Sequence, residues 1–331
     1  MQIVITKTIP KYHHHVPSTM SFLPGLGLSA PPSQPPLEQL TRTVTLRANS
    51  EWRFEVPSTH SITVKLLLEP STSDPSINPG TAEVFGTELA PNHTYTFAPL
   101  TKAAVYTHHG CALEVTGACD SEYTAEETPM TEYTNLHFAL ETMRDASTTT
   151  STTNTSLGGP RVLVVGPKDS GKTSLIKTLT SYATRLSRSP LLINLDPSSP
   201  LLCLPGSISA AVFGTGATLD VEDAASGGWG TSPLLGGPHP TPIKTPLVYH
   251  YGFQGAEEWV EGFKSVTGKL ALAATGRWSE QEETRRSGML VDVGGSACTG
   301  KNDYEVLRFV VSEFSSKWMV LLLAGRLAED V

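Results

Sequence analysis

The segment from Arg161 to Leu179, RVLVVGPKDSGKTSLIKTL, constrains the fold more than any other part of the chain. It begins with an uninterrupted apolar run, which is typical of a strand buried on both faces of a sheet. Gly166 and Gly171 follow, and the residues after Lys172 have the apolar spacing of a helix. A buried strand that passes through a glycine-rich loop into a helix predicts an α/β domain that binds phosphate groups.

The loop itself, GPKDSGKT, matches the pattern G-x-x-x-x-G-K-[ST] at Gly166, Gly171, Lys172 and Thr173. The glycines let the backbone curl so that its N–H groups point at a β-phosphate, and the N-terminus of the following helix adds positive potential. In this pattern the lysine reaches the β- and γ-phosphates and the hydroxyl binds Mg²⁺. We therefore expect nucleotide binding; the alternative is a glycine-rich turn that binds nothing.

A second Mg²⁺ ligand is expected from an acidic residue at the end of a neighbouring strand. Asp196 closes the apolar run PLLINLD, one strand–helix–strand unit after the loop, and Asp292 closes GMLVD. Either residue could instead cap the turn that follows it. The spacing favours Asp196, so Lys172 and Asp196 are the expected catalytic residues, if the site is active, and Thr173 and Asp196 the expected Mg²⁺ ligands.

The front half of the chain follows a different pattern. Residues 1–38 are rich in Pro, Ser, Gly and His and predict a disordered arm. Between residues 40 and 125, short alternating segments rich in Val, Thr, Tyr and Phe are separated by turn residues. About seven such segments predict a small β-sandwich or barrel, which we place at residues 39–130.

The two halves are joined by residues 131–157. Thr134 to Ala146 predict an amphipathic helix, and a Ser/Thr-rich linker follows it. From residue 158 apolar strands alternate with helices, which predicts a parallel sheet. The chain ends soon after the strand KWMVLLLA, where a sheet edge would lie bare. We therefore expect the domain at 158–331 to be incomplete at its C-terminus.

The fold class predicted from these patterns is an α/β P-loop NTPase domain with a parallel sheet, preceded by a small all-β sandwich domain. The net charge of −8 argues against a general nucleic-acid coat or a polybasic membrane binder. No apolar run approaches about 18 residues, so neither a membrane-spanning helix nor a membrane partner is expected. The four cysteines form no C-x-x-C pair, which favours a reducing compartment, either cytoplasm or nucleus.

A GTP-binding switch is a minor hypothesis. The segment DVGG resembles the D-x-x-G of signalling GTPases. Asp292 lies too far along the chain from Lys172 for a compact GTPase core, and no N-K-x-D segment that would recognise guanine is present.

Longer stretches of the sequence resemble a known family. They include LLINLDPSSPLLCLPGSISA and TPLVYHYG in the second half, and EWRFEV, GTAEVFGTELAPNHTYTF and AVYTHHGCALEVTG in the first. With the phosphate loop, they are similar to the polyribonucleotide 5′-hydroxyl kinase family, in the branch of Clp-type subunits of the pre-mRNA cleavage and polyadenylation factor. The resemblance runs from about residue 42 to the end. In that family a β-domain lies against the ATPase domain and a smaller C-terminal domain follows.

This resemblance implies ATP and Mg²⁺ as cofactors and adds site residues. A glutamate and a lysine from the β-domain reach the nucleotide in the family, and the matching positions are Glu51 and Lys102. From the sequence alone both would be solvated strand charges. The phosphate loop implied by the resemblance comprises Asp169, Ser170, Gly171, Lys172, Thr173 and Ser174.

The sequence departs from the active kinases of this family in three places. They carry a D-x-G-Q type segment where this chain has DPSSP, with Ser198 and Ser199 in place of glycine and glutamine. They place a tryptophan that clasps the RNA end near the position of Ser296. The arginine-bearing lid should follow LLLAGRLAEDV, where the sequence ends.

The function implied is an ATP-binding subunit of the pre-mRNA 3′-end cleavage and polyadenylation machinery in the nucleus. ATP would be a structural cofactor for assembly with the scaffold and other subunits of the cleavage factor complex, and RNA would be contacted indirectly or weakly. The alternative is an active polyribonucleotide 5′-hydroxyl kinase that transfers the ATP γ-phosphate to RNA 5′-hydroxyl ends.

Overall fold

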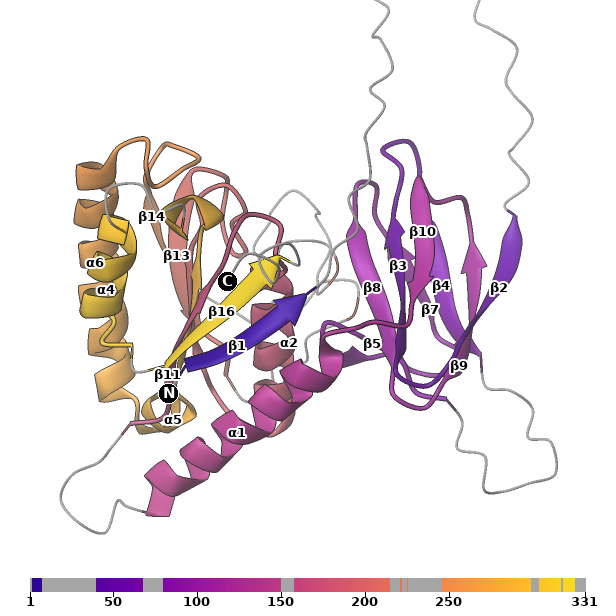
Figure 1. Cartoon of the computed structure of the whole chain (residues 1–331), viewed down its shortest axis with the longest axis horizontal. Coiled ribbons are helices and arrows are strands. Elements are labelled where there is room, and N and C mark those ends of the chain that lie inside the picture. The colour runs from indigo at the N-terminus through magenta and orange to yellow at the C-terminus, as the bar shows by residue number, and fades with distance from the viewer. Residues whose placement is uncertain are drawn as a thin grey trace, which may run out of the picture.

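The structure is a computed structural model, and it describes residues 2–7, 40–67, 80–149, 158–214, 221, 225, 246–298, 304–316 and 318–324. The chain forms a β-sandwich and an α/β unit, and the long helix α1 (Met130–Thr149) runs from the first to the second (Figure 1). The predicted fold class, an all-β sandwich before an α/β domain with a phosphate loop, is confirmed.

The sandwich consists of two sheets whose strands are antiparallel. Its strands are β2 (Thr41–Leu46), β3 (Ser50–Glu55), β4 (Ile62–Leu67), β5 (Glu83–Val84), β6 (Thr87–Glu88), β7 (Thr94–Phe97), β8 (Lys102–Thr107), β9 (Cys111–Thr116) and β10 (Ser121–Ala125). The five-stranded sheet has the order β10-β3-β8-β5-β6, and the four-stranded sheet the order β2-β9-β4-β7. The segments predicted as strands did not include β10.

Alternation of buried and partly exposed side chains along the strands explains this half of the fold. Every second residue of β4 is buried, as expected for a strand with one face on the core. Between the sheets, the rings of Trp52 and Phe54 stack with their centroids 4.4 Å apart, and Phe97 meets Phe54 edge-on at 5.1 Å. The aromatic residues that made the segments resemble strands therefore form the sandwich core.

The α/β unit contains a seven-stranded sheet in the order β1-β16-β11-β15-β12-β13-β14. Its strands are β1 (Gln2–Lys7), β11 (Arg161–Val165), β12 (Leu191–Leu195), β13 (Ser207–Val212), β14 (Leu247–His250), β15 (Met289–Val293) and β16 (Trp318–Ala324). The strands from β1 to β12 pair in parallel, but β13 and β14 are antiparallel. The predicted parallel sheet is thus a mixed sheet, because the loop at residues 196–206 returns the chain from β12 into β13 without a crossover helix.

The N-terminal arm also differs from its prediction. Gln2–Lys7 form β1, which pairs in parallel with β16 and so occupies the sheet edge that we expected to be bare. An apolar strand with an unpaired edge favours the addition of another strand, which supplies partners for its N–H and C=O groups. Residues 8–39, the rest of the predicted arm, lie outside the described residues.

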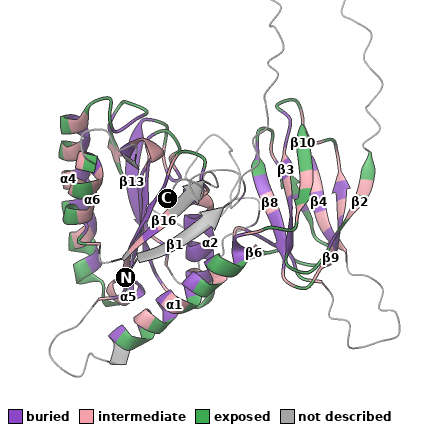
Figure 2. Cartoon of the chain, in the orientation of Figure 1, coloured by how far each residue is buried: buried purple, intermediate pink, exposed green. Residues whose placement is uncertain are grey.

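Helices cover both faces of the sheet (Figures 1 and 2). They are α2 (Lys172–Arg185), α4 (Val260–Glu280), α5 (Glu282–Ser287) and α6 (Glu305–Glu313), with a 3₁₀ turn η2 (Gly295–Cys298). Alternate residues of β11 point into two different cores. Val162 and Val164 pack with α1 and α2, whereas Leu163 and Val165 pack with α4 and α6. Burial on both faces accounts for the continuous apolar run of this strand.

Helix α1 is longer than predicted at both ends and belongs to both halves. Its buried residues Tyr133 and Leu136 share a core with Tyr106 of the sandwich and with α2. Near its C-terminal end, the buried Arg144 donates from Nε to the carbonyl oxygen of Ser287 at 2.7 Å. Within the described ranges, no helix is long and apolar enough to cross a membrane.

The β5–β6 hairpin of the sandwich presses directly on α2. Its Gly86 has φ +79°, and a Cβ there would stand only 3.0 Å from a carbonyl oxygen of α2. On either side, Tyr182 donates a hydrogen bond to Glu83, and Arg185 forms an ion pair with Glu88 at 2.7 Å. Only glycine meets both the backbone angle and the space at this turn, so the sandwich is fixed against the helix that begins at the phosphate loop.

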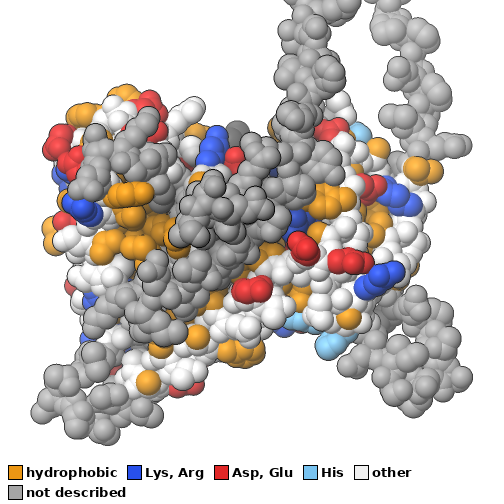
Figure 3. Space-filling view, in the orientation of Figure 1, with side chains coloured by type: hydrophobic (Ala, Val, Ile, Leu, Met, Phe, Trp, Pro, Cys, Tyr) orange, Lys and Arg blue, Asp and Glu red, His pale blue; other side chains and the backbone are white. Residues whose placement is uncertain are grey.

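Charge on the molecular surface is mixed. On the face drawn in Figure 3, Lys and Arg side chains lie scattered among Asp and Glu, and the residues described there form no continuous basic surface.

Candidate nucleotide-binding site

The phosphate loop has the backbone that the glycine spacing predicts. It links β11 to α2, and both Asp169 (φ +61°) and Gly171 (φ +88°) are in the left-handed region. These turns curl the loop, and α2 starts at Lys172 directly after Gly171. The free N–H groups of its first turn, together with the helix dipole, make the inside of the loop a site for anions.

The lysine of the loop is buried and held over it. Lys172 is 5% exposed, and its Nζ donates to the carbonyl oxygen of Pro167 at 2.7 Å. The hydroxyl of Ser170 donates to the same carbonyl at 2.9 Å. The ammonium group therefore lies within the curl of the loop, where it can move to the oxygens of a bound triphosphate.

The hydroxyl of the loop contacts Asp292 at the end of β15. Thr173 Oγ1 donates to Asp292 Oδ2 at 2.9 Å, and Asn194 Nδ2 lies 3.4 Å from the same oxygen. Burial, together with the charge of Asp196, raises the pKa of Asp292 to about 7, although Thr173 and Lys172 partly offset the shift. Asp292 Oδ1 has no hydrogen-bond partner among the described residues.

This arrangement fits a divalent cation. A buried carboxylate with one unsatisfied oxygen beside a threonine hydroxyl is the donor set that Mg²⁺ takes, with phosphate oxygens and water completing the shell. Asp292 was the less favoured of the two acids in the sequence. Asp196 instead accepts from the N–H and Oγ of Ser198 at 3.1 and 2.6 Å, as a turn aspartate does, and it lines the cavity above the loop.

A large cavity of about 730 Å³, here called the phosphate cavity, opens over the loop. Lys172, Thr173 and Asp196 line it on the side of the loop, and residues 254–255 and 257–258 form part of its wall. The sandwich also reaches it, because Arg53 and Lys102 line the same cavity. The sequence places these residues far apart, and the docking of the sandwich on α1 and α2 brings them together.

A second cavity of about 230 Å³, here called the sandwich cavity, adjoins the first. Glu51 and Lys102 of the sandwich line it, together with Met130 and Tyr133 of α1 and the start of α2. The two cavities share Arg53, Glu55, Lys102, Tyr123 and Ser174. The two residues that the family resemblance singled out in the sandwich therefore lie beside the phosphate loop and on the same side of it.

Glu51 and Lys102 differ in their surroundings. Glu51 is 5% exposed, forms an ion pair with Arg53 and accepts a hydrogen bond from Thr128 Oγ1 at 3.0 Å. Lys102 is mostly exposed and pairs with Glu55 at 2.9 Å. A buried glutamate at a cavity wall is not the solvated strand charge that the sequence alone indicated.

Sequence reasoning missed three residues of this region. Asn194 is a polar residue inside the apolar run PLLINLD, and that interruption was a usable signal for a site residue. Arg53 reaches both cavities but looked like an ordinary strand charge. Tyr133 is 2% exposed, and its hydroxyl has no partner in the described part of the chain; nothing in the local sequence distinguished it from a core residue.

The positions where the sequence departs from the active kinases also lie here. Ser198, Ser199 and Ser296 all line the phosphate cavity. Hydroxymethyl groups occupy these three positions, which therefore offer no ring on which a base could stack.

The fold and site define the class: this is a P-loop nucleotide-binding protein with an N-terminal β-sandwich. Two family models match the chain. The N-terminal beta-sandwich domain of polyadenylation factor matches residues 45–147, and the mRNA cleavage and polyadenylation factor CLP1 P-loop matches residues 166–331. The chain therefore belongs to the family of the mRNA cleavage and polyadenylation factor CLP1.

Curated relatives agree with this assignment. The chain is 46% identical over 316 residues to the mRNA cleavage and polyadenylation factor CLP1 of Phaeosphaeria nodorum, covering 94% of this chain and 63% of that protein. The protein of the same description from Botryotinia fuckeliana is 45% identical over 312 residues, covering 93% and 62%. The chain spans less than two thirds of the length of these relatives.

Solved structures give the same result. The wild-type Clp1p–Pcf11p complex matches with a TM-score of 0.70 at 28% identity, covering 88% of this chain and 62% of that one. A second structure, described as an extended interface between Pcf11p and Clp1p and the structural basis for ATP loss in a glycine-to-arginine point mutant, matches with a TM-score of 0.69 at 28% identity, covering 86% and 62%.

Proposed function

We propose that this chain binds ATP between its phosphate loop and its β-sandwich, and that the nucleotide is a structural cofactor that joins the two halves. The observation that carries the proposal is the pair of adjoining cavities, which share Arg53, Lys102 and Ser174. The residues that line the phosphate cavity include Lys172 of the loop as well as Arg53 and Lys102 of the sandwich. A ligand that contacts both halves stabilises the docked state by mass action.

In this proposal the phosphates occupy the loop. The N–H groups of residues 169–174 and Lys172 contact the β- and γ-phosphates. Thr173 and Asp292 hold Mg²⁺, which when bound neutralises phosphate charge, and Asp196 stands at the cavity wall as a further ligand reached directly or through water. The unsatisfied Oδ1 of Asp292 gains a partner in this way.

The base occupies the sandwich cavity. The Glu51 carboxylate can accept a hydrogen bond from the amino group of adenine, and Lys102 can lie near the base or ribose. Guanine presents a carbonyl oxygen where adenine presents that amino group, so a buried carboxylate would disfavour it. The GTP-binding alternative is disfavoured on this ground.

The proposal makes nucleotide retention, rather than phosphoryl transfer, the principal role. Transfer depends on positioning the acceptor and on stabilising charge as it develops. Ser198, Ser199 and Ser296 provide neither the clasp nor the glutamine of the active kinases at the cavity wall. Kinase activity on RNA 5′-hydroxyl ends is therefore the second candidate function.

Assembly is the cellular role that we propose. The relatives are named as mRNA cleavage and polyadenylation factors, and the solved neighbour is a complex with Pcf11p. We infer that this protein acts in the nucleus within the same 3′-end machinery. It would bind a Pcf11-type scaffold subunit and other subunits through its ATPase domain, and would contact RNA only indirectly or weakly.

The test uses γ-labelled ATP and an RNA oligonucleotide with a 5′-hydroxyl end. The purified protein is expected to retain bound ATP through gel filtration and to transfer no label to the RNA above the level of a Lys172→Ala control. Robust labelling that depends on Lys172 would establish the kinase and overturn the structural role.

Replacement of Glu51 by glutamine should weaken ATP binding by about tenfold, because the neutral amide oxygen is a weaker acceptor for the adenine amino group than the carboxylate is. The loss should be smaller for inorganic tripolyphosphate, which has no base to contact the sandwich cavity. Isothermal titration measures both affinities. Glu114→Gln, a half-buried glutamate of β9 that pairs with Lys65 and lines neither cavity, is the matched control. Equal affinities for ATP in the Glu51 variant and the unmodified protein would exclude Glu51 from the base site.

A further inference from the structure

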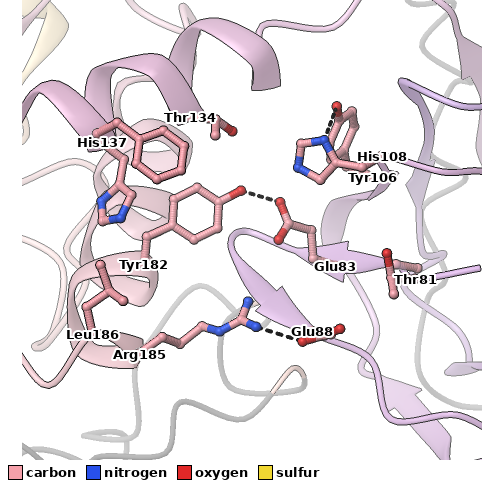
Figure 4. A pocket seen from close by; sticks show the side chains of 12 residues that line it. Thr81, Glu83, Glu88, Tyr106, His108, Thr134, His137, Tyr182, Arg185 and Leu186 are labelled. Atoms are coloured by element: carbon pink, nitrogen blue, oxygen red, sulfur yellow. Dashed lines mark hydrogen bonds and ion pairs between the residues drawn. The ribbon is translucent and has the colours of Figure 1, made fainter.

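A third cavity lies where the sandwich, α1 and α2 meet, and the proposed function does not use it. This junction recess has a volume of about 490 Å³ and is open to solvent (Figure 4). It is formed by the β5–β6 hairpin, by the α1 residues 134–138 and by the C-terminal part of α2. It shares Tyr106 with the sandwich cavity, and none of its lining residues belongs to the phosphate cavity.

Aromatic rings dominate the walls of the recess. The ring of His137 lies 5.2 Å from that of Tyr182 and 5.6 Å from that of Phe138. On the opposite wall, Tyr106 and His108 meet at 4.7 Å (Figure 4). Burial lowers the pKa of both His108 and His137, which favours the neutral form of each imidazole. Neutral rings arranged around a recess attract a cation through their faces.

A buried carboxylate lies among these rings. Glu83 is 9% exposed and accepts a hydrogen bond from the Tyr182 hydroxyl. Two other buried glutamates, Glu51 and Glu141, each form ion pairs with arginines. Within the described residues, no ion pair is formed by Glu83; burial raises its pKa, and the Tyr182 hydrogen bond and the charge of Arg185 offset that shift only in part. A buried carboxylate without a directly bound cation is unfavourable, and a cationic ligand would compensate it.

The rim defines what can enter. Arg185, the basic residue that lines the recess, is already paired with Glu88 at 2.7 Å. The lining of the recess therefore carries two carboxyl groups, Glu83 and Glu88, and one guanidinium group. Beside it, Phe138 and Leu186 are 61% and 52% exposed, so both apolar side chains are accessible to a partner. The recess thus offers an anionic, ring-lined interior next to an apolar rim.

We propose that the junction recess binds an arginine side chain of a partner protein, with apolar neighbours of that arginine covering Phe138 and Leu186. A guanidinium group suits the site because it is planar, weakly hydrated, stacks on rings and donates to a carboxylate. The recess is lined by residues of both halves of the molecule, so a partner would bind there only while the sandwich is docked on α2. The proposal does not depend on nucleotide binding.

The test compares two fluorescein-labelled, C-terminally amidated peptides, Leu-Arg-Leu and Leu-citrulline-Leu, with the full chain by fluorescence polarisation. Citrulline keeps the shape of arginine and removes its charge. The arginine peptide should bind at least about tenfold more tightly, since a cation–π contact and a charge-assisted hydrogen bond are both at stake. Glu83→Gln, which keeps an acceptor for Tyr182, should remove the preference for arginine.

Phe138→Ala serves as a second variant, because its exposed ring can be removed without opening the core. It should weaken the arginine peptide several-fold and leave ATP binding unchanged, whereas Leu272→Ala, on an exposed part of α4, should change neither. Three results would each overturn the proposal: equal binding of the two peptides, no saturable binding of the arginine peptide at millimolar concentrations, or an arginine preference that survives Glu83→Gln.

Discussion

The Lys172→Ala variant is expected to lose ATP binding by at least about a hundredfold, because the ammonium group is the cation nearest the phosphates in the curl of the loop. Thermal denaturation with and without ATP measures the consequence. Unmodified protein at a hundredfold excess of ATP over Kd should gain about 2.7 kcal/mol, which corresponds to a rise in Tm of about 4 °C for a chain of 331 residues. The variant should show almost no rise.

The matched control is Lys269→Ala, which removes an exposed lysine of α4 on the same α/β unit. It should keep the full shift in Tm. If Lys172→Ala retained the shift caused by ATP, the nucleotide would not lie in the loop, and the structural role proposed for it would be wrong. Loss of stability without ATP would show only that the lysine also supports the loop through Pro167.

The Asp292→Asn variant should be more stable than the unmodified protein when no nucleotide is bound, and its affinity for ATP should no longer depend on Mg²⁺. Burial raises the pKa of this carboxyl from 3.8 to about 7, so the folded state disfavours its ionised form. Without nucleotide, the free energy of unfolding therefore falls as the pH rises from about 4 to above 7. Asparagine removes that penalty, which is on the order of 4 kcal/mol at pH 8, and should raise the Tm of nucleotide-free protein by several degrees.

The same variant should bind ATP no better in Mg²⁺ than in EDTA, because asparagine supplies no charge for the cation. Asp196→Asn is the comparison, since that side chain is half-buried at the cavity wall. It should change the nucleotide-free Tm little. If Asp196→Asn abolished the Mg²⁺ effect and Asp292→Asn preserved it, the original preference for Asp196 as the metal ligand would be correct.

The structural features behind these predictions could be predicted from the sequence to different degrees. The loop GPKDSGKT and its flanking strand and helix were predicted because each depends on residues close together in the chain. The sandwich was predicted because alternation and aromatic content identify strands with one buried face. The length of α1 was underestimated, since its ends pack on the sandwich and on Ser287, which are distant in sequence.

Pairing between distant segments was not accessible in the same way. The loop at residues 196–206 has the Pro, Ser and Gly of a turn region, but its composition does not say whether the next strand runs parallel or antiparallel to β12. Strand β1 pairs with the strand at the other end of the chain. The contact of Thr173 with Asp292 likewise depends on the sheet order that puts β15 beside β11. Glu51 was singled out through resemblance alone, because burial of a strand glutamate is decided by docking and not by local pattern.

The central claim is that one nucleotide contacts both the phosphate loop and the sandwich. Photo-crosslinking with 8-azido-ATP, followed by mass spectrometry of the labelled peptides, tests it most directly. The account predicts that label is attached to peptides carrying β3 or β8, around Glu51 and Lys102, and that excess ATP but not GTP prevents it. Label confined to peptides of the α/β unit, or equal protection by GTP, would contradict the account.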